Sequence, residues 1–306
     1  MNLVVWGLGK HAINKILPAV KKTKEFNLYG VCTRNTNTLK KIKKIHNIKG
    51  WTSPSEMFKD KKINAIYLST PPALHAEQAI KIIDNDLHLL CEKPLTMSFE
   101  ETSLLINKAD AQNLIIMEGL MYLYHPHHQA IRDLFYGKKL GHIKEIKSSF
   151  QLPPLDLPGY RKDLKLGASA IYDLGIYPSS LILDLFDYSQ IQIIQKELTY
   201  HKNFKYDIAG KVELKIKDKI DCSINWAYDK TYVNELSISA ENLCLHSELV
   251  FSKDFNHRAN ISLFKNEELV ENISIEEADH FELMLKFFFK LIRGHQDCLL
   301  RNKSML

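Results

Sequence analysis

The sequence predicts an α/β Rossmann domain with a parallel, doubly wound sheet, followed by an α+β domain with an open, mostly antiparallel sheet. From residue 1 to 119, short apolar runs alternate strictly with longer stretches of helical period, and parallel strands need such crossovers. After residue 120, strand-like runs follow one another through short connections, which is typical of hairpins. We therefore expect a dinucleotide-binding domain over residues 1–119 and a substrate-binding and dimerisation domain over residues 120–306.

The first domain is expected to hold five strands joined by four helices. The strand-like runs lie at 3–6, 28–32, 65–69, 87–91 and 114–118, and the helical patterns near 11–24, 38–46, 73–85 and 98–111. Ser98 followed by Glu101 has the spacing of a capping box, in which each side chain bonds to the other residue's backbone N–H. Strict alternation predicts a sheet covered on both faces by helices.

The second domain is expected to be a sheet with helices on one face. Its strand-like runs lie at 143–151, 191–200, 208–217, 219–227, 232–240, 243–251 and 260–264, and its helices near 126–136, 168–186 and 276–293. Phe281, Leu285, Phe288 and Phe289 give the last helix an apolar stripe.

The composition of the 306-residue chain is that of an ordinary globular protein, with 45% hydrophobic and 25% charged residues. It excludes disorder, collagen-like repeats and a small disulfide scaffold. The net charge of +5 is too small to predict nucleic-acid binding, but residues 1–120 carry +6 and the remainder −1. Most of these lysines are interpreted as solvated helix faces, although a basic lobe would also suit an anionic small molecule.

Cysteine and hydropathy patterns predict a cytoplasmic protein. The five cysteines, including Cys298, form no C-x-x-C pair, so we expect no metal site and reduced thiols. The strand at residues 2–6 leaves no space for a signal segment. The least charged stretch, residues 113–131, contains Glu118 and several histidines, which argues against a membrane span.

A glycine-rich motif follows the first strand and predicts a dinucleotide site. It reads Gly7-Leu8-Gly9-Lys10-His11-Ala12. The glycines permit a tight turn and close approach of the backbone to a pyrophosphate, which the amides at the helix start would bind. The motif alone is weak, but its position between a strand and a helix favours the functional interpretation over a plain turn.

The end of the second strand favours NADP over NAD. It reads Cys32-Thr33-Arg34-Asn35 and lacks the carboxylate that would accept hydrogen bonds from an adenine-ribose 2′-hydroxyl. Arg34 would instead pair with a 2′-phosphate and Thr33 would donate a hydrogen bond to it. Arg34 could instead stack on the adenine or face solvent. In that case it would not select a 2′-phosphate, and NAD would be the alternative cofactor.

Two further segments carry candidate catalytic groups. Glu92-Lys93-Pro94 follows the strand at 87–91, at the edge of a parallel sheet where ligands bind. In a helical segment, Asp173 and Tyr177 would share one face. A nearby lysine would stabilise tyrosinate, and a phenol with a lowered pKa can exchange a proton with a substrate oxygen.

With these motifs the chain resembles the Gfo/Idh/MocA oxidoreductases. The resemblance is carried by the opening G-x-G-x-x-A, the run from Ala65 to His75, the E-K-P at 92–94, the stretch from Glu118 to Pro126 and the G-A-x-A-x-x-D-x-G-x-Y segment at 167–177. It covers residues 3–186, and the rest agrees in fold pattern alone. It implies NAD or NADP and hydride transfer at a secondary alcohol or ketone, usually of a sugar or cyclic polyol.

The resemblance also implies roles for individual residues. Lys93 would orient the substrate oxygen, Asp173 would contact substrate or proton donor, and Tyr177 would be that donor. Tyr177 places the chain near the branch of glucose-fructose oxidoreductase, dihydrodiol dehydrogenases and sugar ketoreductases, since many relatives have histidine there. The cofactor would be lined by Ser69, Thr70, Pro71 and His75, with Glu92 behind the nicotinamide.

Two features near residue 125 bear on the site. Relatives often have an arginine close to the cofactor or substrate pocket at the position of Leu123. Because this chain lacks it, the resemblance does not by itself imply the family's usual substrate. His125, His127 and His128 are interpreted as structural, because no carboxylate or cysteine ligand lies nearby in the sequence, and no metal is expected.

We therefore expect an NADPH-dependent keto-sugar reductase that acts on a small sugar-like substrate. The alternatives are a dihydrodiol or free-sugar dehydrogenase of the same family, a regulatory protein that binds NADP without catalysis, and a partner-binding protein. We expect a homodimer or homotetramer formed through the second-domain sheet, because a broad open sheet needs cover.

Overall fold

The computed structural model describes residues 1–153, 159–202, 205–228 and 230–295. The chain divides into two compact units, and the first passes to the second between Leu120 and Met121. Residues 281–295 group with the first unit again. Each unit is described by itself below.

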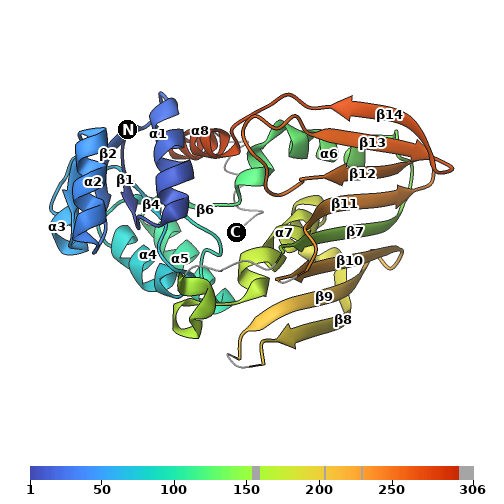
Figure 1. Cartoon of the computed structure of the whole chain (residues 1–306), viewed down its shortest axis with the longest axis horizontal. Coiled ribbons are helices and arrows are strands. Elements are labelled where there is room, and N and C mark those ends of the chain that lie inside the picture. Colours follow the sequence, from blue (N-terminus) through green and yellow to red (C-terminus); the bar gives the residue numbers. More distant parts are fainter. Residues whose placement is uncertain (154–158, 203–204, 229, 296–306) are drawn as a thin grey trace. The chain divides into compact units, whose positions relative to one another are not determined.

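The first unit contains a six-stranded, fully parallel sheet in the order β3-β2-β1-β4-β5-β6. Figure 1 labels its strands β2, β1, β4 and β6. The strands are β1 (Asn2–Trp6), β2 (Asn27–Cys32), β3 (Lys49–Trp51), β4 (Ala65–Leu68), β5 (His88–Cys91) and β6 (Ile116–Glu118). This order confirms the predicted doubly wound sheet, and it places a reversal of strand order between β1 and β4, where such sheets bind ligands. The three-residue strand β3 was not predicted.

Helices cover both faces of this sheet. They are a π-helical segment (Ala12–Ile16) continued by α1 (Leu17–Lys22), α2 (Thr36–His46), α3 (Pro54–Phe58), α4 (His75–Ile83) and α5 (Phe99–Ala111). The core on one face joins Val4 and Leu68 of the sheet to Ile82 of α4 and Leu105 of α5. All four residues of β4 are buried, as expected for a strand covered on both sides.

The last helix, α8 (His280–Ile292), belongs to the first unit from Phe281 onward, whereas the sequence had placed it in the second domain. Its apolar stripe explains the difference. Phe288 is fully buried and stacks on Phe26, with ring centroids 5.8 Å apart. Periodicity predicted the apolar face of the helix, but it does not say which core that face covers.

The second unit contains an eight-stranded sheet in the order β14-β13-β12-β11-β7-β10-β9-β8. The strands are β7 (Ile143–Gln151), β8 (Ile191–Tyr200), β9 (Asp207–Ile216), β10 (Ile220–Ala227), β11 (Val233–Ala240), β12 (Cys244–Glu248), β13 (Asn260–Lys265) and β14 (Glu268–Ser274). All neighbours are antiparallel except β7 and β10, which are parallel. The predicted open, mostly antiparallel sheet is confirmed, and β14 is an addition.

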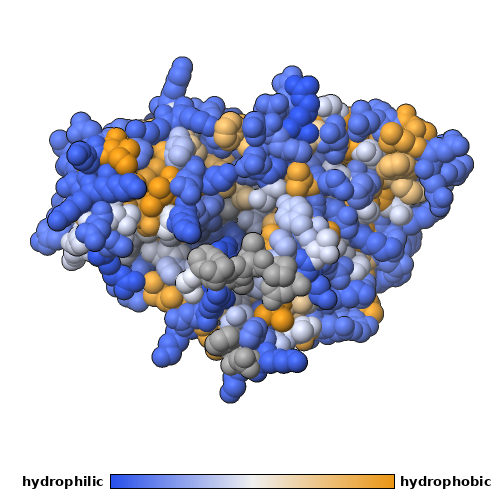
Figure 2. All heavy atoms as spheres, viewed as in Figure 1, coloured by the Kyte–Doolittle hydropathy of each residue, from blue (hydrophilic) through white to orange (hydrophobic). Residues whose placement is uncertain are grey.

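Helices α6 (Pro126–Tyr136) and α7 (Ile176–Leu185) belong to this second unit. Burial alternates along β7, β11 and β12, so one face of the sheet is packed and the other is open. The space-filling view shows a mainly hydrophilic visible surface with smaller apolar areas (Figure 2). Within the described ranges, no helix is long and apolar enough to cross a membrane.

The described cysteines are unpaired thiols. Cys32, Cys91 and Cys222 are buried and Cys244 is exposed, whereas Cys298 lies outside the described residues. Burial raises the pKa of Cys32 and of Cys222 to about 12. These buried thiols therefore remain protonated and pack as small apolar groups.

Candidate functional site

Gly7 forms the turn in which the ends of three strands meet. Its φ is +103°, and a Cβ built on it would lie 2.3 Å from the carbonyl oxygen of Ser69, so a side chain there is excluded by both conformation and space. The Gly7 N–H donates to the Cys32 carbonyl at 3.0 Å, and the Ser69 N–H donates to the Trp6 carbonyl at 2.7 Å. The carboxyl ends of β1, β2 and β4 therefore converge at this turn.

The rest of the glycine motif leads into the first helix. A Cβ built on Gly9 meets no atom within 4 Å, so this glycine faces open space in the protein itself. Ala12 is fully buried at the contact of helix and sheet, while Leu8 is partly exposed and Lys10 and His11 are exposed. A small residue at the packing contact and a bare backbone before it are the features that allow approach of a pyrophosphate.

Thr33 and Arg34 lie at the adjacent end of β2. The Thr33 N–H donates to the Trp51 carbonyl at 3.0 Å, and its hydroxyl oxygen accepts from the Asn35 N–H at 3.3 Å. Arg34 is exposed, and the Asn35 side chain caps α2 by accepting from the Thr38 N–H at 3.0 Å. This turn presents a guanidinium and no carboxylate.

The surplus of lysines is not concentrated at this turn. Lys21 and Lys22 end α1, and Lys43 and Lys44 end α2, at the helix ends opposite to the glycine motif. Cations there are stabilised by the negative end of the helix dipole. The case for a 2′-phosphate therefore depends on Arg34 rather than on the overall charge of the unit.

The segment after β4 is joined to the segment after β5 by His75. This histidine is fully buried, and its ring nitrogens lie 2.7 Å from the Pro94 carbonyl and 2.8 Å from the Thr70 carbonyl. Burial lowers the pKa of His75, and the two carbonyl oxygens oppose the decrease. The Thr70 hydroxyl donates to Gln78 at 2.6 Å, while Ser69 and Pro71 are partly exposed.

Glu92 binds His11 of the glycine motif. Its Oε1 lies 2.9 Å from His11 Nε2 and accepts from the Tyr67 hydroxyl at 2.5 Å. Burial raises the pKa of Glu92, but His11, the Tyr67 bond and the Lys93 charge together lower it to about 2. Glu92 is therefore an ionised group that ties the end of β5 to the start of the first helix. The sequence analysis did not single out Tyr67, because it lies within an otherwise apolar strand.

Lys93 follows Glu92, and a second carboxylate lies beside the same segment. Glu118, at the end of β6, accepts from the Leu95 N–H at 2.7 Å. Burial raises the pKa of Glu118 to about 7, although the Leu95 bond and the Lys93 charge act to lower it. The first unit thus gathers the glycine motif, Glu92, Lys93 and Glu118 at the carboxyl edge of its sheet.

Asp173 belongs to the second unit and is held by two side chains that the sequence did not single out. Arg161 donates to both of its carboxylate oxygens, through Nε at 2.5 Å and Nη2 at 3.0 Å, and the Tyr228 hydroxyl donates at 2.7 Å. Burial and the neighbouring Asp173 raise the pKa of Tyr228. Arg161 precedes Asp173 by 12 residues and Tyr228 follows it by 55, with no motif joining the three, so only the folded chain reveals this cluster.

Tyr177 lies one turn further along, at the start of α7. Its ring is 7% exposed and packs against the rings of Tyr122, Phe150 and Phe251, with centroids 5.9, 5.2 and 5.7 Å away. Its hydroxyl donates to the sulfur of Met121 at 3.8 Å, a weak acceptor. The aromatic side chains restrict the phenol to one orientation.

The helix that carries Tyr177 is distorted where it begins. Residues Ile171–Gly175 are π-helical, a local widening that is frequent at functional sites. A Cβ on Gly175 would lie 2.8 Å from the Trp226 ring, so glycine permits close packing of this segment on β10. The Ile171 N–H donates to Asp207 at 2.8 Å, which anchors the segment to β9.

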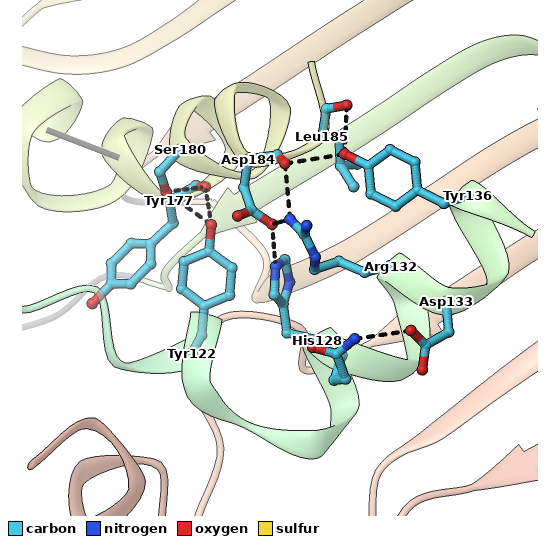
Figure 3. Close-up of polar contacts among 10 residues, drawn as sticks. Tyr122, His128, Arg132, Asp133, Tyr136, Tyr177, Ser180, Asp184 and Leu185 are labelled. Atoms are coloured by element: carbon cyan, nitrogen blue, oxygen red, sulfur yellow. Dashed lines mark hydrogen bonds and ion pairs between the residues drawn. The ribbon is translucent and has the colours of Figure 1, made fainter. Parts of the chain in front are cut away.

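A second set of polar contacts fixes α7 against α6. Figure 3 shows Asp184 pointing toward His128 and Arg132. Asp184 lies 2.7 Å from His128 Nε2 and forms an ion pair with Arg132. The Tyr122 hydroxyl meets the Ser180 hydroxyl at 2.8 Å and donates to the Tyr177 carbonyl at 3.3 Å. These bonds hold both ends of α7.

The histidines around residue 125 make contacts typical of structural residues. His125 accepts from the His127 N–H at 3.0 Å at the start of α6, and His127 Nε2 lies 2.7 Å from the Ser247 hydroxyl. Across the part of the chain that the structure describes, no group of three histidine, cysteine or acidic side chains has the arrangement of a metal site. Leu123, at the position where the family resemblance implies an arginine, is buried at 2% exposure.

Family and fold comparisons agree with this geometry. Residues 1–120 match the GFO_IDH_MocA family model, described as an oxidoreductase family with an NAD-binding Rossmann fold. The predicted resemblance to this family is thereby confirmed.

One curated relative is dTDP-3,4-didehydro-2,6-dideoxy-alpha-D-glucose 3-reductase of Saccharopolyspora spinosa. It is 30% identical over 175 residues, which are 57% of this chain and 53% of the relative. Trans-1,2-dihydrobenzene-1,2-diol dehydrogenase of Xenopus laevis is 30% identical over 172 residues, 56% and 51% of the two chains. The chain therefore matches about half the length of these relatives.

Solved structures extend the likeness in fold to the whole chain. A 3-ketoreductase from Actinomadura kijaniata, crystallised with NADP and TDP-benzene, superposes with a TM-score of 0.92 at 20% identity and covers 100% of this chain and 94% of its own. Aldose-aldose oxidoreductase from Caulobacter crescentus, crystallised with glycerol, gives a TM-score of 0.86 at 14% identity, covering 100% and 94%. At these identities the likeness shows the fold, which here comprises both units.

Proposed function

We propose that the protein is an NADP-dependent oxidoreductase that reduces the ketone of a sugar-like substrate to a secondary alcohol. The observation that carries the proposal is the position of Lys93 at the carboxyl edge of a Gfo/Idh/MocA Rossmann sheet. Lys93 there follows Glu92, which is bonded to His11 of the glycine motif. A keto-sugar substrate is favoured because relatives include 3-ketoreductases of dTDP-linked deoxysugars.

The residues of the first unit fit a dinucleotide. The turn at Gly7 and the open space at Gly9 suit the pyrophosphate, and Arg34 with Thr33 suits a 2′-phosphate. When bound, NADPH supplies the hydride. Titration of nicotinamide fluorescence should show tighter binding of NADPH than of NADH, and Arg34→Ala should remove most of that difference. Tighter binding of NADH by the parent protein would refute the preference.

The catalytic roles are assigned from the chemistry of the side chains. Lys93 holds the carbonyl oxygen and stabilises the negative charge that develops there, and Tyr177 gives its phenolic proton to that oxygen. The product is a secondary alcohol, and solvent returns the proton to Tyr177. Asp173, which orients Arg161 and Tyr228, contacts the substrate or the donor. A positioned acid of this kind contributes roughly a hundredfold to ten-thousandfold to the rate.

The activity is tested by following NADPH oxidation with a panel of substrates. A dTDP-linked 3-keto-deoxysugar is tested for reduction by NADPH. A trans-dihydrodiol and D-xylose are tested for oxidation by NADP. All three are substrate types named in relatives. We expect turnover of the keto sugar and its loss in Lys93→Met. Turnover of only the dihydrodiol or xylose would move the protein to a dehydrogenase branch. Equal rates for Lys93→Met and parent would refute the role of Lys93.

We propose in addition that the protein assembles as a homodimer or homotetramer through the sheet of the second unit. The support is a sheet with one packed and one open face, whose edge strand β8 exposes Ile193, Ile194, Leu198 and Tyr200 by 42–60%. Exposed apolar side chains in one strand favour association. Light scattering after size exclusion should give at least twice the 35.4 kDa of the chain. A monomer would refute the proposal.

A further inference from the structure

Glu118 lies beside the segment that carries Lys93, although the proposed reaction assigns it no role. Strands β5 and β6 are parallel neighbours, and Glu118 is in register with Cys91. Glu92 and Lys93 follow Cys91 directly. The topology therefore brings a second carboxylate to the segment that contains Lys93.

The backbone around Lys93 is held from two sides. On one side, Glu118 Oε1 accepts from the Leu95 N–H at 2.7 Å. On the other side, the buried His75 ring contacts the Pro94 carbonyl at 2.7 Å. The Gly119 N–H donates to the Cys91 carbonyl at 2.7 Å, which fixes the end of β6 against β5. Glu118 is thus joined to the Lys93 segment by a charge-assisted bond.

We infer that Glu118 is a positioning residue for Lys93, which fixes the chain after it through Leu95 and sets the positive charge that Lys93 presents to the substrate oxygen. This inference rests on the proposed function, because it assumes that the charge of Lys93 stabilises the developing negative charge. With Glu118 neutral, Lys93 has one ionised carboxylate fewer beside it. With Glu118 ionised, both Glu118 and Glu92 offset its charge, and less positive charge is left for the transition state.

The electrostatic surroundings make this change of charge accessible near neutral pH. The titratable groups around Glu118 are Cys91, Glu92 and Lys93, and His75 reaches the same segment from α4. Burial raises the pKa of Glu118 to about 7, whereas the pKa of Glu92 is about 2. Burial keeps Cys91 a thiol by raising its pKa, and it lowers the pKa of His75. Glu118 therefore changes charge between pH 6 and pH 8, while Glu92 remains ionised.

The first test compares single-turnover ketone reduction by the parent and by Glu118→Gln from pH 6 to pH 8. Glutamine keeps an oxygen that accepts from Leu95 but carries no charge. We expect the parent rate to fall about tenfold as Glu118 ionises, in line with a unit charge several ångströms away, and the variant to stay within about twofold. Glu77→Gln, which removes an exposed carboxylate of α4 paired with Lys81, is the matched control and should retain the parent profile.

The second test does not depend on catalysis. In ¹³C-labelled protein, the Glu118 carboxyl resonance, assigned through its own backbone resonances, should titrate near pH 7. In Lys93→Met, its midpoint should rise by about one pH unit, because a cation that favours the carboxylate is lost. This measurement leaves Glu118 unchanged, so it remains informative even where Glu118→Gln fails to fold.

The outcomes separate the inference from the proposed function. A Glu118→Gln profile that follows the parent, or a midpoint unmoved in Lys93→Met, would overturn the inference. A Glu118→Gln protein that is merely less stable, with an unchanged pH profile, would also overturn it, because a structural role alone predicts that result. A shifted midpoint in a protein that reduces no ketone would support the coupling of the two charges while refuting the proposed function.

Discussion

The Tyr177 ring is held on three sides by Tyr122, Phe150 and Phe251. Aromatic contacts of this kind fix the orientation of a ring at small entropic cost. A phenol held in this way can meet a substrate oxygen in one geometry, which is what a proton donor requires. Phenylalanine at this position would keep these ring contacts and lose the bond to the sulfur of Met121, 3.8 Å away, which is a weak acceptor.

Tyr177→Phe should therefore separate catalysis from stability. We expect kcat for ketone reduction to fall about a hundredfold or more, with NADPH affinity and the melting temperature close to those of the parent. Tyr122→Phe is the matched control, since its hydroxyl bonds to Ser180 and to the Tyr177 carbonyl; its loss should destabilise by about 1 kcal/mol and lower kcat much less. Steady-state kinetics and thermal unfolding of both variants would expose the opposite pattern.

The two glycines of the opening motif should respond differently to alanine. Gly7→Ala places a Cβ 2.3 Å from the Ser69 carbonyl at a φ of +103°, so we expect a clear loss of stability as well as of cofactor binding. Gly9→Ala meets no protein atom within 4 Å. Its melting temperature should stay near that of the parent while its NADPH dissociation constant rises at least about tenfold, because the methyl group occupies space left for the pyrophosphate. Equal affinity of Gly9→Ala and parent would contradict this assignment.

At the residue scale, the sequence was most informative where a single local feature determines the conformation of a residue. Gly7 follows a strand and precedes a helix, so its turn could be predicted from neighbouring residues alone. Tyr67, Arg161 and Tyr228 were not predicted, because their roles arise from partners that the fold brings near: Glu92 for Tyr67, and Asp173 for the other two.

At the scale of elements, α7 is held by its C-terminal half as firmly as by its start. Asp184 is buried at 4% side-chain exposure between His128 and Arg132 of α6. Removing one partner of a buried ionic cluster leaves the others uncompensated. The position of Tyr177 at the other end of α7 therefore depends on contacts that are remote from the proposed chemistry.

Asp184→Asn should accordingly reduce the free energy of unfolding by about 3 kcal/mol. The control is Asp133→Asn on α6, because Asp133 is exposed and its carboxylate accepts from Gln129 at 2.8 Å; we expect a change within about 0.5 kcal/mol. Urea unfolding of the two variants makes the comparison. A similar, small effect of both substitutions would show that the cluster does not anchor α7.

Elements with long and regular patterns were predicted, and the exceptions have physical causes. Strand β3 has three residues, too few for any periodicity to register. Strand β14 alternates exposed and partly exposed positions without a buried face, so it lacks an apolar signature. The π-helical segments at 12–16 and 171–175 follow the hydrophobic pattern of ordinary helices, and only the hydrogen-bond pattern distinguishes them.

At the scale of the whole molecule, the chain returns to its first unit at its last described helix. Residues 281–295 group with residues 1–120, and Phe281 of α8 contacts the ring of His11 at 5.2 Å. His11 in turn binds Glu92. A helix that the sequence analysis placed in the second domain by its position in the chain thus supports the glycine motif, a relation that depends on tertiary packing alone.

Acid should destabilise the protein through buried histidines in the second unit. Burial, with a contribution from Lys253, lowers the pKa of His125 from 6.5 to about 4 and that of His127 from 6.5 to about 2. Above pH 6.5 neither the folded nor the unfolded chain protonates them. As the pH falls below 6.5, the unfolded chain binds two protons that the folded chain excludes until about pH 4 and pH 2. The free energy of unfolding should therefore fall by about 1.4 kcal/mol per pH unit for each histidine over that range.

The double variant His125→Asn, His127→Gln should remove this dependence while keeping the hydrogen bonds. The asparagine oxygen replaces the His125 Nδ1 that accepts from the residue 127 N–H, and the glutamine amide replaces the His127 Nε2 that bonds to Ser247. Asparagine is also a favoured helix cap. We expect urea unfolding between pH 6.5 and pH 4.5 to show a slope smaller than that of the parent by about 2 to 3 kcal/mol per pH unit. Parallel slopes for the two proteins would mean that other groups, foremost the carboxylates, govern unfolding by acid.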